Sequence, residues 1–253
     1  MKNTSEHLFE YCLRLGDTPL ILGQRLAEWC GHGPILEEDI AMTNISLDCI
    51  GQARAFLTYA GEIEGKDRTE DDLAYFRNER EFRNLLITEQ PNEDFAQTML
   101  RQFLISAFHK HFYSELMRSA DKTLSALAEK SLKEVNYHFR HSSEWLKRFG
   151  NGTEESRTRL MNAMDNLWRY TGDMFDMDET DKHLVECKIA ADLDKIKTLW
   201  NKSVEEVFSE AGIDMPKDVF MMSGSRKGKH TEHLGHILAE MQSLARSFPG
   251  ASW

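Results

Sequence analysis

Proline is rare in this 253-residue chain, and this most limits the folds available to it. Only five prolines occur, and four of them, Pro34, Pro91, Pro216 and Pro249, lie in segments that already contain other breaks. The long windows between them are free to form helices. Strand-like alternation of apolar and polar residues is not convincing in any of these windows. The sequence therefore predicts an all-α protein.

Apolar periodicity places the predicted helices. They span residues 6–30, 36–64, 70–84, 94–119, 123–149, 154–174, 178–189, 192–211 and 231–247. The first, second, fourth and fifth are of bundle length, and short connections predict that sequence neighbours pack antiparallel. We expect one domain over 1–253, with an antiparallel four-helix core over about 6–150 and shorter helices and an arm over about 151–253.

Charge and cysteine usage narrow the class of protein. The 42 acidic and 31 basic residues give a net charge of -11, which opposes a surface that follows nucleic-acid phosphates. Cys12, Cys30, Cys49 and Cys187 form no C-x-x-C pair, which favours reduced thiols. No apolar stretch has the length of a membrane span. We expect a cytoplasmic protein that binds neither nucleic acid nor membrane.

Histidine spacing bears on metal binding. Carboxylate-bridged di-iron bundles use Glu-x-x-His, because a three-residue step puts both side chains on one helix face. None of the ten histidines has an aspartate or glutamate three residues before it. We therefore expect no metal site and no cofactor in this chain.

Four side chains are nevertheless candidates for a vestigial or atypical metal site. They are Glu28, Asp48, Glu134 and His138. Asp48 and Gln52 interrupt an apolar face of the 36–64 helix, which predicts an interior polar pair. A histidine three residues after Asp48 would stand at Gly51, and one after Glu134 would stand at Tyr137. The four-residue step from Glu134 to its histidine favours an ordinary ion pair or hydrogen bond over a metal ligand.

The densest polar signal is the segment 230–236, which follows a glycine-rich cationic arm at 224–229. Its three histidines lie at three-residue steps. Two such steps turn the side chains progressively away from one helix face, and no other predicted helix offers acidic residues that could complete a metal site. The arm suits docking on a carboxylate or a phosphate, and a solvated loop is the alternative. The candidate interaction residues are Arg226, Lys227, Lys229, His230 and His233.

Several segments together resemble one known family. They are Leu22–Pro34, Asn44–Arg54, Glu89–Asn92, Lys133–Glu134, Tyr137–His138, Gly150–Thr153, Leu167–Thr171, His230–Gln242, Pro249–Gly250 and Trp253. These segments resemble the non-catalytic C subunits of the bacterial phenylacetyl-CoA epoxidases. The likeness extends over nearly the whole chain and is more specific than any single motif within it.

The resemblance implies a ferritin-like helical fold without a di-iron centre of its own. It also implies a hetero-oligomer with the di-iron catalytic subunit, which is the A component of the complex, with the other epoxidase subunits and with a reductase that carries FAD and an iron-sulfur cluster and takes electrons from NADPH. The family assigns no catalytic residue to this subunit. We expect a structural, metal-free component of a monooxygenase complex in aerobic phenylacetate degradation, which could form a homodimer when isolated.

Two other functions stay open. One is a stand-alone di-metal carboxylate oxygenase that uses the atypical ligands named above. The other gives Arg226, Lys227 and Lys229 a role in holding the phosphates of coenzyme A at a subunit boundary.

Overall fold

The structure, a computed structural model, describes residues 3–251, and within that range all regular elements are helices. The predicted all-α class is therefore confirmed. The chain divides into two compact units. The first unit comprises the described residues up to Pro91 and from Gly224 onward, and the second comprises Asn92–Ser223. Within residues 3–251, none of the helices combines the length and the apolar content that crossing a membrane requires.

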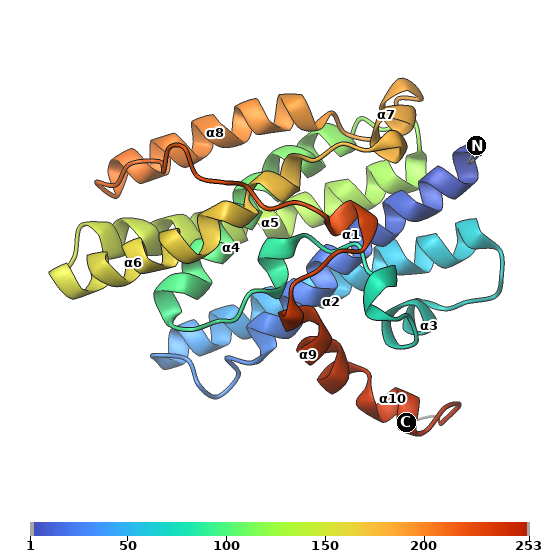
Figure 1. Cartoon of the computed structure of the whole chain (residues 1–253), viewed down its shortest axis with the longest axis horizontal. Coiled ribbons are helices and arrows are strands. Elements are labelled where there is room, and N and C mark those ends of the chain that lie inside the picture. Colours follow the sequence, from blue (N-terminus) through green and yellow to red (C-terminus); the bar gives the residue numbers. More distant parts are fainter. Residues whose placement is uncertain (1–2, 252–253) are drawn as a thin grey trace. The chain divides into compact units, whose positions relative to one another are not determined.

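The first unit is built on two long helices. Its α-helices are α1 (Thr4–Ala27), α2 (Leu36–Glu64), α3 (Glu70–Tyr75), α9 (Glu232–Met241) and α10 (Ser243–Ser247). Its short 3-10 turns are η1 (Glu79–Glu81), η2 (Leu86–Glu89) and η5 (Ser225–Lys227). Figure 1 shows α1 and α2 running antiparallel along most of their length. This is the arrangement that a short connection between two long helices predicts.

The ends of these helices follow local capping chemistry. The side chain of Asn3 accepts a hydrogen bond from the backbone N–H of Glu6 at 2.9 Å, and the Glu6 carboxylate accepts one in return from the backbone N–H of Asn3 at 2.7 Å. This capping box satisfies donors that a helix start leaves free. At the same end of the antiparallel pair, α2 stops before Gly65, whose φ of 65° is the left-handed conformation common after a helix.

The second unit contains α4 (Phe95–Leu116), α5 (Lys122–Gly150), α6 (Glu154–Leu167), α7 (Glu179–Glu186) and α8 (Leu193–Glu210), with 3-10 turns η3 (Trp168–Tyr170) and η4 (Gly172–Phe175). Asp94, Asp121 and Thr153 cap α4, α5 and α6 by accepting backbone N–H groups at 2.9, 2.9 and 3.2 Å. The helices α5, α6 and α8 all contact α4. The chain therefore supplies two long-helix pairs, α1 with α2 and α4 with α5, which are the elements of a ferritin-like bundle.

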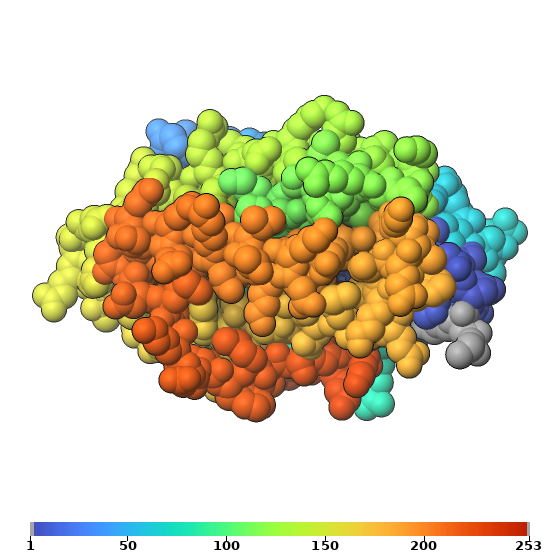
Figure 2. Space-filling model, turned by 90° about the horizontal axis from the view of Figure 1, so that it is seen from above, coloured from blue at the N-terminus to red at the C-terminus, as the bar shows by residue number. Residues whose placement is uncertain are grey.

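Aromatic rings fix α8 in the second unit. Phe103 of α4 lies 5.7 Å from Phe139 of α5 and 5.8 Å from Phe208 of α8, measured between ring centroids. The indole N–H of Trp200 donates to the carbonyl of Leu104 at 3.0 Å, so this buried ring leaves no unsatisfied donor. Figure 2 shows α8 in orange across the face of the molecule seen there.

The structure changes the predicted organisation in three places. The predicted helix 70–84 ends at Tyr75, and side chains of the C-terminal segment donate to the carbonyls of Ala74 and Tyr75, which a longer helix would have used. The predicted helix 154–174 breaks after Leu167 into η3 and η4. The predicted helix 231–247 is divided at Gln242 into α9 and α10. The C-terminal arm falls in the first unit. The single domain over 1–253, with its core over about 6–150, stays a prediction.

Two glycines provide a stability test of these packings. A Cβ atom on Gly150, the last residue of α5, would overlap the carbonyl oxygen of Ala211, whereas a Cβ on Gly51 in α2 meets nothing within 4 Å. We expect Gly150→Ala to lower the free energy of unfolding by about 1–3 kcal/mol through overpacking. Gly51→Ala should raise it by about 0.5–1 kcal/mol, because alanine is the better helix former. Urea denaturation followed by helical circular dichroism measures both, and equal effects at the two positions would contradict the packing described.

Candidate functional site

The structure places the first two metal-ligand candidates at or near the surface of the first unit. Glu28 follows the last residue of α1, is exposed, and accepts a hydrogen bond from Arg25 at 2.8 Å. Asp48 is half-buried on α2, while Gln52, one turn later, is buried. The predicted interior polar pair is therefore confirmed for Gln52 and is wrong for Asp48, which lies at the edge of the buried face.

The other two candidates lie on α5 in the second unit. His138 is buried and Glu134 is half-buried. His109 of α4 is buried as well, and burial, followed by the charge of His138, lowers the pKa of His109 to about 3. At neutral pH His109 is therefore a neutral imidazole, and its ring stacks on Tyr113 with the centroids 5.1 Å apart. A neutral, stacked ring of this kind fills a helix interface.

The positions used in the spacing argument face outward. Gly51 and Tyr137 are both exposed, so a histidine at either place would point to solvent. These positions therefore do not report on the interior of the protein. Among residues 3–251, no three His, Cys, Asp or Glu side chains are placed to hold one metal ion. The predicted absence of a metal site stays a prediction.

The cationic arm divides into an outer and an inner part. Lys227 and Lys229 are exposed, and Arg226 is half-buried. Gly228 has a φ of 65°, and a Cβ atom there would overlap the carbonyl oxygen of Arg80. Only glycine fits this combination of a left-handed conformation and close backbone approach. The arm is thus pressed onto the segment around Arg80 while its lysines stay in solvent.

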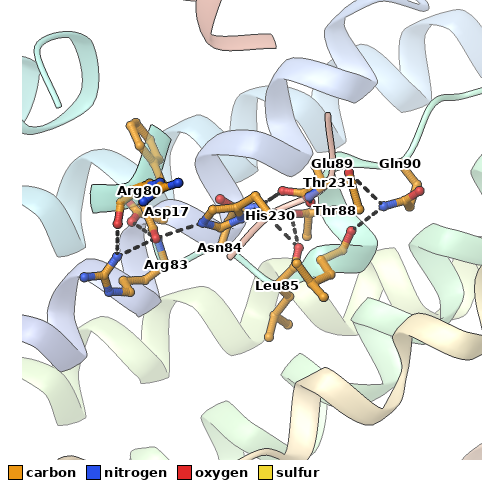
Figure 3. A network of polar contacts seen from close by, with 12 residues as sticks. Asp17, Arg80, Arg83, Asn84, Leu85, Thr88, Glu89, Gln90, His230 and Thr231 are labelled. Atoms are coloured by element: carbon orange, nitrogen blue, oxygen red, sulfur yellow. Dashed lines mark hydrogen bonds and ion pairs between the residues drawn. The ribbon is translucent and has the colours of Figure 1, made fainter. Parts of the chain in front are cut away.

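The inner part of the arm ends in a buried ion pair. The His230 ring donates from Nδ1 to Oε2 of Glu89 at 3.1 Å and from Nε2 to the carbonyl oxygen of Phe82 at 3.0 Å. The backbone N–H of Thr231 donates to the other carboxylate oxygen of Glu89 at 2.7 Å. Figure 3 shows His230 and Thr231 beside Glu89. An imidazole that donates from both nitrogens carries the extra proton and the positive charge.

The surroundings of Glu89 support this charge state. Its Oε2 atom also accepts a hydrogen bond from the Asn84 side chain at 3.0 Å, and the side chains of both Glu89 and His230 are fully buried. Burial alone would lower the pKa of His230, but the hydrogen bond and the charge of Glu89, the Phe82 carbonyl and the charge of Asp17 together raise it above its ordinary value. The arm therefore carries a buried, protonated histidine paired with a buried carboxylate.

A second buried carboxylate, Asp17 of α1, organises the neighbouring segment. The Arg77 guanidinium bonds both Asp17 oxygens, with one N···O distance of 3.0 Å, and the backbone N–H of Arg83 donates to Oδ2 at 2.8 Å. The Arg83 side chain turns back to Glu10 of α1 at 2.6 Å. A buried charge is strongly destabilising unless it is paired, so these contacts fix segment 77–83 onto α1.

The chain beyond α9 is held by a third set of contacts. The Gln242 side chain donates to the carbonyls of Ala74 and Arg77, each at 3.0 Å. Arg246 donates to the carbonyls of Tyr75, Phe76 and Arg77, at 3.2, 3.2 and 2.8 Å. These side chains satisfy the carbonyls left free at the end of α3. Segment 224–247, which we call the C-terminal strap, is thus attached to the rest of the first unit at three places.

One half of the buried pair, His230, was among the candidate interaction residues, and the other half, Glu89, was not. The expectation for the arm was docking on a carboxylate or a phosphate, with a solvated loop as the alternative, and the structure pairs His230, which follows the arm, with Glu89. His233 is half-buried at the start of α9, and His236 is exposed, so the three histidines share no site. The signal for Asp17 was available, because an aspartate inside an apolar helical run requires a partner. The arrangement orients and fixes backbone, and it offers no nucleophile.

The pH dependence of stability tests the His230–Glu89 pair. We expect His230→Gln to lower the free energy of unfolding by about 3 kcal/mol at pH near 6, because it leaves Glu89 buried without its cation. Since the pKa of His230 is raised on folding, the stabilisation is complete below the unfolded value of about 6.5 and is lost as the pH rises through the folded value. Urea denaturation from pH 6 to 9 measures the free energy of unfolding of wild type and variant, and the difference between the two should become smaller as the pH rises.

The exposed His236 supplies the control. His236→Gln should change the free energy of unfolding by less than about 0.5 kcal/mol at every pH. A difference between wild type and His230→Gln that stays constant over this pH range would show that His230 is not charged in the folded protein.

Comparison with known proteins gives one consistent relationship. The family model described as phenylacetic acid catabolic protein matches residues 1–253. A relative from Escherichia coli strain K12, named as the C subunit of 1,2-phenylacetyl-CoA epoxidase, is 48% identical over 246 residues, which are 97% of this chain and 99% of the relative. The resemblance inferred from the sequence segments is thus confirmed. The chain belongs to the phenylacetic acid catabolic protein family.

Proposed function

We propose that this chain is a structural subunit of a phenylacetyl-CoA epoxidase complex in aerobic phenylacetate degradation. The observation that carries this proposal is 48% identity to the C subunit of such an epoxidase over 97% of one chain and 99% of the other. Because the similarity extends over almost the full length of both chains, it disfavours the alternative that the two proteins share one domain but differ in function. The proposed role is to support the catalytic subunit of the same complex.

The proposed partner is the di-iron catalytic subunit, with the remaining epoxidase subunits and the reductase completing a cytoplasmic hetero-oligomer. In this proposal iron belongs to the catalytic subunit, and FAD, the iron-sulfur cluster and NADPH belong to the reductase. This chain contributes a rigid helical surface. It carries out no step of the oxygenation.

The chemistry of the buried carboxylates supports a structural role. Glu89 accepts hydrogen bonds from His230, Thr231 and Asn84, and Asp17 accepts them from Arg77 and Arg83. Carboxylates with this many donors are engaged in holding segments of the chain together. Glu28 is exposed and bonded to an arginine, which is the environment of a surface ion pair and not of a metal ligand.

Co-expression with the di-iron catalytic subunit from the same organism tests the proposal. We expect the two chains to purify together, with iron near two atoms per catalytic subunit, and this chain alone to be helical with well under about 0.1 metal ion per molecule. Metal analysis of both preparations, size-exclusion chromatography and an assay of phenylacetyl-CoA epoxidation with the reductase provide the readouts. Epoxidation should require both chains.

A ligand-removal variant separates this proposal from the stand-alone oxygenase. Glu28→Gln combined with Asp48→Asn should leave the iron content per catalytic subunit of the complex unchanged. Two tightly bound metal ions in the chain alone, lost in this double variant, would instead establish the di-metal oxygenase. Failure of the wild-type chains to associate under any salt condition would contradict the subunit role itself.

A further inference from the structure

Helix α2 has apolar residues on two sides, and one of these sides is exposed. Leu36, Ile40 and Leu47 are 73%, 51% and 64% exposed, and Ile35, immediately before the helix, is 52% exposed. Steps of four and seven residues place the three helical side chains on one face. We call these four residues the α2 stripe.

The buried side of the same helix is already occupied. Met42, Ile45 and Phe56 are fully buried, and α1 lies along α2 within the first unit. The helix thus satisfies its own packing without the stripe. Exposed aliphatic side chains that share one helix face can contribute to a surface that binds another protein. Gly51, which meets nothing within 4 Å, continues the stripe without a side chain and leaves room for another backbone to approach.

The charges around the stripe indicate what can bind it. Residues 35–48, which span the stripe, include Glu37, Glu38, Asp39 and Asp48 and neither lysine nor arginine. Glu38 is buried, and the exposed Arg54, two turns beyond the stripe, is paired with Glu70 at 3.1 Å. Glu37 is exposed on the first turn, beside Leu36, and Asp48 follows Leu47 at the edge of the buried face. An apolar partner surface flanked by lysine or arginine side chains is therefore favoured, since opposite charges at the rim direct association.

A second copy of this chain does not fit this requirement. It would bring the same acidic rim to the contact, and each molecule already carries a formal charge of -11. Like charges placed against one another oppose association and select against a wrong partner. The stripe is therefore better matched to a different chain.

We infer that the α2 stripe docks an amphipathic helix of the catalytic subunit, whose apolar face is bordered by basic side chains. This inference rests on the proposed function and names the surface through which it is carried out. Helices that pack by interlocking side chains use residues at such spacings as anchors. The exposed aliphatic side chains provide the apolar centre of the contact, and Glu37 provides part of its charged rim.

The test compares variants of the stripe with a matched surface control. The stripe variant combines Leu36→Ser, Ile40→Ser and Leu47→Ser. The control combines Leu244→Ser and Phe248→Ser, which change exposed apolar residues of the same unit that are 53% and 59% exposed. Both variants should keep the helical spectrum and the melting temperature of the wild type, because the changed side chains are outside the buried core.

Binding to the purified catalytic subunit is measured by calorimetry or surface plasmon resonance. We expect the stripe variant to bind at least about 100-fold more weakly, because it removes the apolar centre of the contact, and the control to bind within about threefold of wild type. Glu37→Lys should weaken binding by about 5–10-fold at low salt and by less at high salt. Sedimentation of the chain alone should show no dimer that depends on the stripe.

The outcomes separate the surface from the function. Wild-type binding that the stripe variant retains would overturn the inference while leaving the subunit role intact. No binding by the wild type would overturn both. If the isolated chain forms a dimer and the stripe variant does not, the stripe serves self-association. If Glu37→Lys binds the catalytic subunit more tightly than wild type, the partner surface is not bordered by basic side chains.

Discussion

The neutralisation of two buried carboxylates, Asp17 and Glu89, is the constraint on which the first unit depends. A charged carboxylate inside a protein is strongly destabilising unless cations and hydrogen-bond donors surround it. Here the donors come from segments far from α1 and η2 in sequence. Arg77 and Arg83 serve Asp17, while His230 and the backbone of Thr231 serve Glu89 from a position 141–142 residues later. Removing either carboxylate would leave buried donors without acceptors. Each carboxylate therefore fixes the position of the segments that donate to it, and these segments in turn stabilise its charge.

This constraint explains why the C-terminal strap returns to the N-terminal helices. The strap provides the histidine for Glu89, the glycine that permits contact with Arg80, and the donors to the last carbonyls of α3. Each attachment uses a polar group that helix formation alone leaves unsatisfied. The short helices α9 and α10 are therefore held in place by specific hydrogen bonds, and α9 also by the burial of Leu234, Ile237 and Leu238. These two helices help to fix the fold of the first unit. One face of α2 nevertheless stays exposed.

The same buried charges bear on function. Of the four side chains that the sequence offered as remnants of a metal cage, Glu28 is exposed, Asp48 and Glu134 are half-buried and His138 is buried, and the network of buried charge in the first unit fixes backbone. The contact that we infer with another chain uses the acidic border of the α2 stripe and its aliphatic centre. The structural role that we propose requires rigid internal pairing and an outer face that a partner can bind.

The sequence by itself determined the all-α class, the bounds of α2 and, to within a few residues, those of α4, α5 and α8, because proline placement and apolar periodicity are local properties. Family segments spread along the chain likewise identified the family. The sequence also marked His230 and the cationic arm, but only the tertiary structure decided that its partner is Glu89, that Asp48 lies at an edge, and that positions 51 and 137 face solvent. The physical reason is that pairing between residues distant along the chain depends on packing and desolvation, which leave no periodic signal in the sequence.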